Sequence, residues 1–159
     1  MPGKEDTYHW ALIVGPKDEK ETSRGYRIHV KDTSLSSQEK VWVLEERESS
    51  MQATGQLLIR VLVAKITDRD RLLRSLRTVP IVKGDASWNC VSWVKEALGI
   101  LREDGKAIGT SKLDWQTVRD TAMAYCQRKR NDHRFDGKAR FDMSKAATYD
   151  LLEMKETIP

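Results

Sequence analysis

Residues 88–101 read Trp-Asn-Cys-Val-Ser-Trp-Val-Lys-Glu-Ala-Leu-Gly-Ile-Leu, and their pattern predicts an amphipathic helix. The apolar positions recur at spacings of three and four residues: Val91, Val94, Leu98 and Leu101. Asn89, Ser87 and Asp85 are candidate caps just before this run. Cys90 therefore falls in the first turn. There the free N–H groups and the positive end of the helix dipole stabilise a thiolate and can hold an oxyanion.

The chain before this helix is expected to form β-strands. Four segments are rich in β-branched and aromatic residues or alternate in polarity: 8–15, 26–30, 40–46 and 57–66. The last of these is apolar on both faces, as in a central strand or in one covered by helices. Helices are expected over 68–76, 91–101 and 114–129, and the tail from residue 136 shows little periodicity. Strands followed by helices predict an α+β class, in a single domain over residues 1–159.

Composition restricts the kind of protein. The chain has 159 residues, 39% apolar and 33% charged, and no apolar run approaches the roughly 20 residues that cross a bilayer. Residues 1–6 contain no signal-peptide core, so we expect a cytoplasmic protein with no membrane partner. Its two cysteines, Cys90 and Cys126, are then expected to be free thiols. The three histidines lack ligand-like spacing, so neither a metal nor another cofactor is expected.

Positive charge is concentrated towards the end of the chain. The formal net charge is only +4, which usually indicates no more than a solvated surface. Between residues 128 and 140, however, six basic residues accompany two acidic ones. Such a cluster favours contact with an RNA backbone. The residues expected to contact phosphates are Arg119, Arg128, Lys129, Arg130 and Arg134.

His9 and His29 are the candidate partners of Cys90, because a nucleophilic thiol needs a nearby imidazole. The third histidine, His133, follows a basic run at a helix end and is expected to be solvated. His9 shares a strand face with apolar side chains, where a histidine is more often a core residue than a base. If the first two strands pair as a hairpin, His9 and His29 become neighbours, one as base and one fixing its ring. On these grounds Cys90 is either a packed thiol or a nucleophile, whereas Cys126, in mid-helix, is expected to be packed.

Three motifs carry a resemblance: residues 9–15, His-Trp-Ala-Leu-Ile-Val-Gly; the later His29; and Asn89-Cys90 at a helix start. In this order they resemble the permuted papain-like enzymes, of which the lecithin:retinol acyltransferase group is the parallel. The resemblance implies an antiparallel sheet packed against helices, with a nucleophile at a helix N-terminus. It also implies Cys90 as nucleophile, His9 as base and His29 as the residue that orients the base. The chain departs from that group at residues 91–93 and shows no hydrophobic anchor, which disfavours phospholipid substrates.

Over nearly its whole length the chain is also similar to a family of small fungal proteins. The shared phrases lie at residues 8–16, 88–94, 113–115, 118–120 and 149–153. We associate this family with the arginine-containing cyclodipeptide synthases, which take aminoacyl groups from charged tRNA. The resemblance implies that Cys90 holds arginine as a thioester and passes it to the amine of a second aminoacyl-tRNA. The dipeptide then cyclises to a diketopiperazine, so the implied partners are arginyl-tRNA and a second charged tRNA.

Side chains near the catalytic pair are candidates for binding that substrate. Those expected to line the site and keep water from a thioester are Trp10, Trp88, Asn89 and Trp93. The carboxylate that pairs with a guanidinium group is expected among Glu45, Glu46 and Asp85. Other functions stay open. One is a papain-like thiol hydrolase acting as peptidase, amidase or thioesterase; another is an acyltransferase of the lecithin:retinol type; a third is a binding module without activity.

Overall fold

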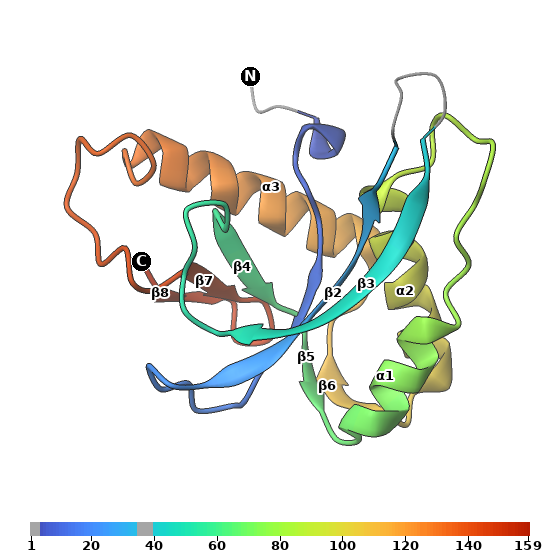
Figure 1. Ribbon diagram of the computed structural model, residues 1–159. Coiled ribbons are helices and arrows are strands. Elements are labelled where there is room, and N and C mark those ends of the chain that lie inside the picture. The colour runs from blue at the N-terminus through green and yellow to red at the C-terminus, as the bar shows by residue number, and fades with distance from the viewer. Residues whose placement is uncertain (1–3, 35–39) are drawn as a thin grey trace.

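The computed structural model describes residues 4–34 and 40–159 and confirms the predicted α+β class (Figure 1). The helices are α1 (Arg69–Arg77), α2 (Cys90–Asp104) and α3 (Trp115–Asn131), and a short 3-10 turn covers Glu5–Thr7. The strands are β1 (Leu12–Val14), β2 (Arg24–Asp32), β3 (Trp42–Ser50), β4 (Ile59–Leu62), β5 (Ala64–Ile66), β6 (Ile108–Ser111), β7 (Ala147–Asp150) and β8 (Lys155–Ile158).

The sheet that carries the site has the order β1-β2-β3 and is antiparallel throughout. In its register Leu12 lies opposite Ile28, and His29 lies opposite Glu45. Ile28 and Val30 are buried in the main core, so this face of β2 packs against the interior, where α2 contacts it. β1 and β2 pair antiparallel, which confirms the hairpin that is expected to bring His9 and His29 together.

The expected strand over residues 57–66 is wrong in detail. It is two short strands, β4 and β5, which belong to different sheets. β4 lies at the edge of the sheet β4-β7-β8 and packs against α3, so helix cover rather than a central position explains its apolar character. β4 pairs with β7 in parallel, whereas the resemblance to the papain-like enzymes implied an antiparallel sheet. The long crossover through the helices between these two strands permits that direction.

Other boundaries differ in ways that local pattern explains. The first strand is regular only over Leu12–Val14, although the expected segment began at residue 8. The tail forms β7 and β8, which are four residues each and too short for a clear alternation. Among the described residues, no helix has both the length and the apolar character needed to span a membrane.

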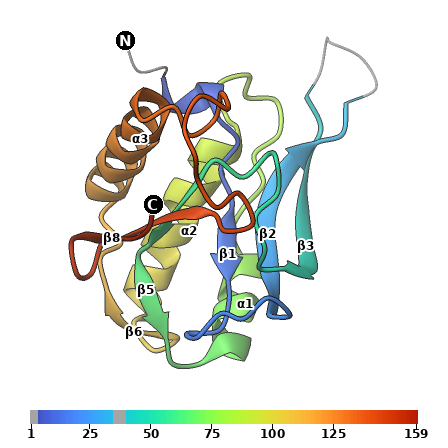
Figure 2. The same ribbon diagram turned by 90° about the vertical axis from the view of Figure 1, so that its left-hand side faces the viewer.

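Helix α2 lies at the centre of the fold. Figure 2 shows α3 and the β2–β3 ribbon on opposite sides of the molecule, with α2 between them. The Asn89 side chain caps α2 by accepting hydrogen bonds from the N–H groups of Val91 and Ser92, and Ser92 completes a capping box. At the other end Gly105 adopts a left-handed conformation, with φ of 59°, that stops the helix. These local signals set the helix start at Cys90.

Candidate active site

A relay of three side chains crosses the sheet β1-β2-β3. His9 Nε2 lies 2.6 Å from His29 Nδ1, and His29 Nε2 lies 2.8 Å from Glu45 Oε2. The two imidazole rings meet edge to face, with an interplanar angle of 80°. His29 and Glu45 are cross-strand partners, whereas His9 reaches His29 from the segment just before β1. The structure therefore brings together the two histidines that the sequence predicts as partners, and it places the Glu45 carboxylate next to His29.

Two cations hold the carboxylate of Glu45 in place. Lys31 Nζ lies 2.6 Å from Oε1, and Arg27 Nη2 lies 3.4 Å from Oε2. The hydrogen bonds from Lys31 and from His29 lower the pKa of Glu45 to about 2. Glu45 is consequently ionised at neutral pH and accepts hydrogen bonds without donating any.

His9 is exposed, whereas His29 is only 6% exposed. Of the two interpretations of His9, the core position does not hold, because the residue lies just before β1 and its side chain is exposed. Partial desolvation of the His9 ring, together with the positive charge of Arg27, holds its pKa below the ordinary value of 6.5. A neutral imidazole at neutral pH suits a general base.

Cys90 is the first residue of α2 and is 7% exposed. Its Sγ lies 3.8 Å from the carbonyl oxygen of Tyr8, the residue that precedes His9. The N–H groups of Val91 and Ser92 donate to Asn89 Oδ1, while the Cys90 N–H has no acceptor within the described part of the chain. The thiol thus sits between a helix N-terminus and the segment that carries the imidazole, which is an arrangement suited to nucleophilic attack on a carbonyl group.

The predicted wall residues have different surroundings. Asn89 is engaged as the helix cap, and Trp93 is fully buried in the core, so neither side chain faces a substrate space. Trp88 is 6% exposed and packs edge to face on Trp42, with 5.9 Å between ring centroids. Trp10 is half-buried and lines a cavity beside His9. Of the four, Trp10 is the one that the structure places on the cavity that His9 also lines.

The other two candidate carboxylates are engaged elsewhere. Glu46 forms a bidentate ion pair with Arg77 of α1, at 2.7 and 2.8 Å. The exposed Asp85 accepts hydrogen bonds from the Ser87 N–H and hydroxyl, which form a turn before α2. Neither carboxylate contacts the relay in the structure.

A cavity of about 410 Å³ opens beside the relay. His9, Tyr8 and Trp10 contribute to its wall. The rest is mainly aliphatic side chains from β1, β4, β5, α2 and α3, together with Met123 and Cys126. Burial raises the pKa of the Cys126 thiol, as its expected role in packing requires. A space of this size and character suits an apolar group of a ligand.

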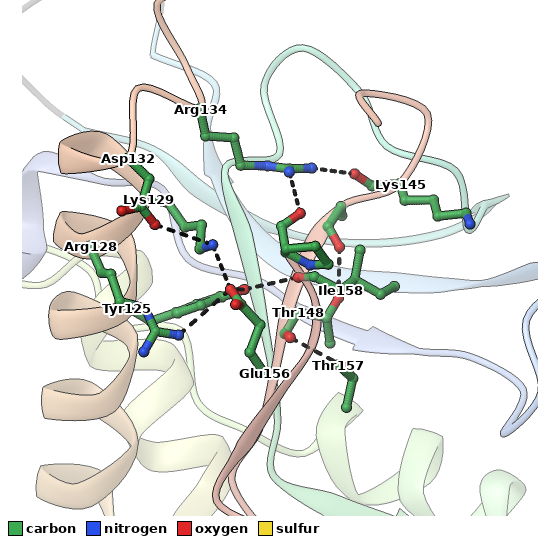
Figure 3. A network of polar contacts seen from close by, with 12 residues as sticks. Tyr125, Arg128, Lys129, Asp132, Arg134, Lys145, Thr148, Glu156, Thr157 and Ile158 are labelled. Atoms are coloured by element: carbon green, nitrogen blue, oxygen red, sulfur yellow. Dashed lines mark hydrogen bonds and ion pairs between the residues drawn. The ribbon is translucent and has the colours of Figure 1, made fainter. Parts of the chain in front are cut away.

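The predicted RNA-contacting set divides into buried and exposed members. Lys129 and Arg134 are 2% and 3% exposed, so their inclusion was wrong. Figure 3 shows both side chains pointing into a network between α3 and the C-terminal strands. Arg134 donates to the backbone carbonyls of Asp142, Lys145 and Pro159, and Lys129 pairs with Glu156 at 2.6 Å. The strands β7 and β8, which the sequence pattern did not reveal, fold back over these two residues.

Arg119, Arg128 and Arg130 remain at or near the surface of α3. Arg119 pairs with Glu5 at 2.7 Å, and the Arg130 guanidinium lies 5.2 Å from the centre of the Tyr8 ring. Two of the three arginines therefore contact the segment that leads into His9. His133 is exposed and bonds to Asp136 at 2.7 Å, as its predicted solvation allows.

Two features of the site were missed. The sequence predicts Glu45 as a substrate-binding residue rather than as a partner of His29, and it predicts no site role for Tyr8. The signal for Glu45 was the run of Arg27, His29 and Lys31 on one face of β2, since a carboxylate on the next strand complements such a face. Across the described residues, no group of three or more His, Cys, Asp or Glu side chains is arranged to hold a metal ion.

Comparison with known proteins gives one match. The model of a family of unknown function (DUF6914) matches residues 1–158. No curated protein and no solved structure matches the chain.

Proposed function

The chain belongs to this family of unknown function, so we propose its activity from the site itself: a cysteine acyltransferase that works through a thioester on Cys90. The observation that carries the proposal is the contact of 2.6 Å between His9 and His29. His9 directly follows Tyr8, whose carbonyl oxygen lies beside the Cys90 thiol. In this proposal the fold is a permuted papain-like one, with His9 as base and His29 as its orienting partner.

The first half-reaction joins the acyl group to sulfur. His9 takes the thiol proton, and the electron pair left on Sγ attacks the ester carbonyl carbon. The Cys90 N–H at the start of α2 is a suitable donor to the oxyanion that forms. The ester C–O bond then breaks, and His9 returns the proton to the departing hydroxyl group.

The second half-reaction transfers the acyl group to an amine. The amine attacks the thioester carbonyl carbon, the C–S bond breaks, and the proton lost by the amine returns to the sulfur through His9. If the amine belongs to a second aminoacyl ester, the free amine of the new dipeptide attacks that ester. This second amide bond closes the diketopiperazine, the ester C–O bond breaks, and the proton lost by the amine goes to the departing alcohol.

We propose aminoacyl-tRNA, with arginyl-tRNA as the first donor, as the substrate class of this transfer. The support is the exposed Arg130, whose guanidinium lies against Tyr8, next to His9, where it can meet phosphates. Arg119 is paired with Glu5 and Asp120, so it can contact a phosphate only by exchanging one of those contacts. Arg128 lies further along the same helix. None of Glu45, Glu46 and Asp85 is free of partners in the structure, so arginine recognition through one of them requires that a present contact be exchanged.

Incubation with charged tRNA tests this proposal. Intact mass spectrometry of the wild-type protein should show arginine attached to Cys90, and the Cys126→Ala variant should behave in the same way. Cys90→Ala should form no adduct and no cyclic dipeptide. If the wild-type protein neither acquires an adduct nor consumes arginyl-tRNA, the synthase proposal fails.

A thiol hydrolase is the second candidate, and the apolar cavity of about 410 Å³ beside His9 favours it. In this alternative an apolar acyl group occupies the cavity while it is attached to Cys90, and a water molecule, rather than an amine, attacks the thioester. p-Nitrophenyl esters with acyl chains of increasing length measure this directly. Hydrolysis that depends on Cys90, needs no RNA and rises with chain length supports the hydrolase, whereas cleavage unchanged in Cys90→Ala excludes it.

A further inference from the structure

We infer that Glu45 is a positioning residue, which acts through His29 to leave Nδ1 of His9 as the ring nitrogen that accepts the Cys90 proton. This inference rests on the proposed role of His9 as base. It gives Glu45 a role different from that of an arginine-binding carboxylate. It also specifies which nitrogen of His9 takes part in the reaction, because the hydrogen bonds of a histidine ring decide its tautomer.

The assignment runs along the relay from the carboxylate. An ionised carboxylate only accepts, so His29 Nε2, at 2.8 Å from Glu45, must donate to it. In a neutral His29 ring, Nδ1 then carries a lone pair. His9 Nε2, at 2.6 Å from that nitrogen, must donate to it. His9 Nδ1 is consequently left without a proton, and it has no hydrogen-bond partner among the described residues.

Charge around Glu45 keeps this direction fixed. Lys31 and Arg27 contact the two oxygens at 2.6 and 3.4 Å, and they lie on the same face of β2 as His29. A protonated Glu45 would donate rather than accept, but ionisation persists because both contacts favour the charged form. The side chain is also only 24% exposed, so its position is held by packing as well as by charge.

The same relay explains how the proton is accommodated after transfer. The thiol proton moves to His9 Nδ1, the electron pair stays on sulfur, and the His9 ring becomes an imidazolium. Its Nε2–H still donates to His29 Nδ1, and the His29 Nε2–H still donates to Glu45. No proton has to change position within the relay, so the negative carboxylate stabilises the imidazolium without rearrangement.

Replacement by an amide removes the fixed direction. In Glu45→Gln the amide either accepts from His29 Nε2 or donates to it, because it carries both kinds of group. Donation makes His29 Nδ1 the protonated nitrogen, which turns His9 Nε2 into an acceptor and places the proton on His9 Nδ1. In that tautomer His9 cannot take a proton from the thiol on that side.

Two measurements on the full chain test the inference. ¹⁵N NMR of histidine-labelled protein at neutral pH identifies the protonated nitrogen of each ring, and the rate of Cys90 alkylation by iodoacetamide reports base function. Glu45→Gln should yield a mixture of tautomers, and alkylation should slow in proportion to the molecules with the proton on His9 Nδ1, which is about twofold when the two tautomers are equally populated. Glu45→Asp keeps the charge and should recover part of that loss. Glu48→Gln, an exposed glutamate of the same strand paired with Arg24, is the matched control and should match wild type.

Each outcome has a defined meaning. A proton on His9 Nδ1 in the wild type, or unchanged tautomers and rate in Glu45→Gln, overturns the positioning role. A wild-type Cys90 that reacts no faster than a free thiol overturns the proposed function instead. The NMR measurement does not depend on Cys90 reactivity, so it separates these two failures. Circular dichroism of each variant verifies that it is folded.

Discussion

Two glutamates, Glu45 on β3 and Glu156 on β8, each collect several cationic or hydroxyl partners, yet the two clusters end differently. Glu45 binds Lys31, Arg27 and His29, and through His29 the contacts continue to the exposed His9. Glu156 binds Lys129 at 2.6 Å and the Tyr125 hydroxyl at 2.8 Å, with Arg128 at 3.6 Å. The first cluster opens towards a cavity, whereas the second closes between α3 and β8 (Figure 3).

The difference shows that two similar clusters around a glutamate have different roles, depending on whether the last residue of the cluster is exposed or buried. Burial and the contact with Glu156 raise the pKa of Tyr125, so its hydroxyl stays protonated and donates. Lys129 is nearly inaccessible, and its Nζ pairs with Glu156 and Asp132 inside the protein. The Glu156 cluster therefore anchors the C-terminal strands, while the Glu45 cluster leads to His9, whose side chain solvent can reach.

Replacement of His9 should have the largest effect in this comparison. His9→Gln is expected to slow Cys90 alkylation by about 10²–10⁴, because it removes the base while leaving the thiol in place. Kinetics with iodoacetamide at pH 7.5 measure it. Tyr125→Phe, which alters the closed cluster, serves as the control and should keep the wild-type rate. Equal rates in His9→Gln and wild type would contradict the assignment of His9.

Glu156→Gln should lower the stability of the fold and leave the rate of Cys90 alkylation unchanged, which is the opposite of the result expected for His9→Gln. Loss of the charge leaves Lys129 buried with Asp132 at 3.4 Å as its remaining carboxylate, and we expect a loss of about 2 kcal/mol in the free energy of unfolding. Urea denaturation measures the change. Glu153→Gln, on an exposed pair with Lys155, should cost less than about 0.5 kcal/mol. An alkylation rate that falls together with stability would mean that the two clusters are coupled.

Arginines outside the closed cluster should alter RNA binding by a smaller amount. Arg130→Gln is expected to weaken tRNA binding and to reduce the slope of log K against log salt by about 1. Arg134→Gln should leave that slope unchanged, because Arg134 is buried and bonds to backbone carbonyls. Filter binding across a salt series distinguishes the two. The same slope change in both variants would contradict a surface contact confined to the exposed arginines.

The smallest predicted effect is on the pH dependence of the thiol. Alkylation of Cys90 should decline as His9 becomes protonated, and the midpoint should lie below 6.5 because the pKa of His9 is lowered. Arg27 contributes to that lowering by charge repulsion, after the larger effect of desolvation. Arg27→Gln should therefore move the midpoint upward by less than about one unit. An alkylation profile over pH 4.5–8 measures the shift, and a downward movement would contradict it.

Several elements of the fold could be predicted because their signals are local. The apolar spacing predicted α2, with Asp85, Ser87 and Asn89 as candidate caps. The structure selects Asn89, whose cap contacts lie within three residues. The hairpin of β1 and β2 followed from two alternating segments. Splitting of residues 57–66 between two sheets could not be predicted in this way, because it depends on β6 and β7 arriving from distant parts of the chain.

By itself the sequence indicated that Cys90 opens a helix and that the segments carrying His9 and His29 are able to meet. Those outcomes depend on capping groups and side-chain alternation within short segments. Tertiary structure alone decided that Glu45 lies behind His29, because the register between β2 and β3 sets that pair. It also decided that Lys129 and Arg134 are buried, because the returning C-terminal strands cover residues whose local sequence reads as an exposed basic run.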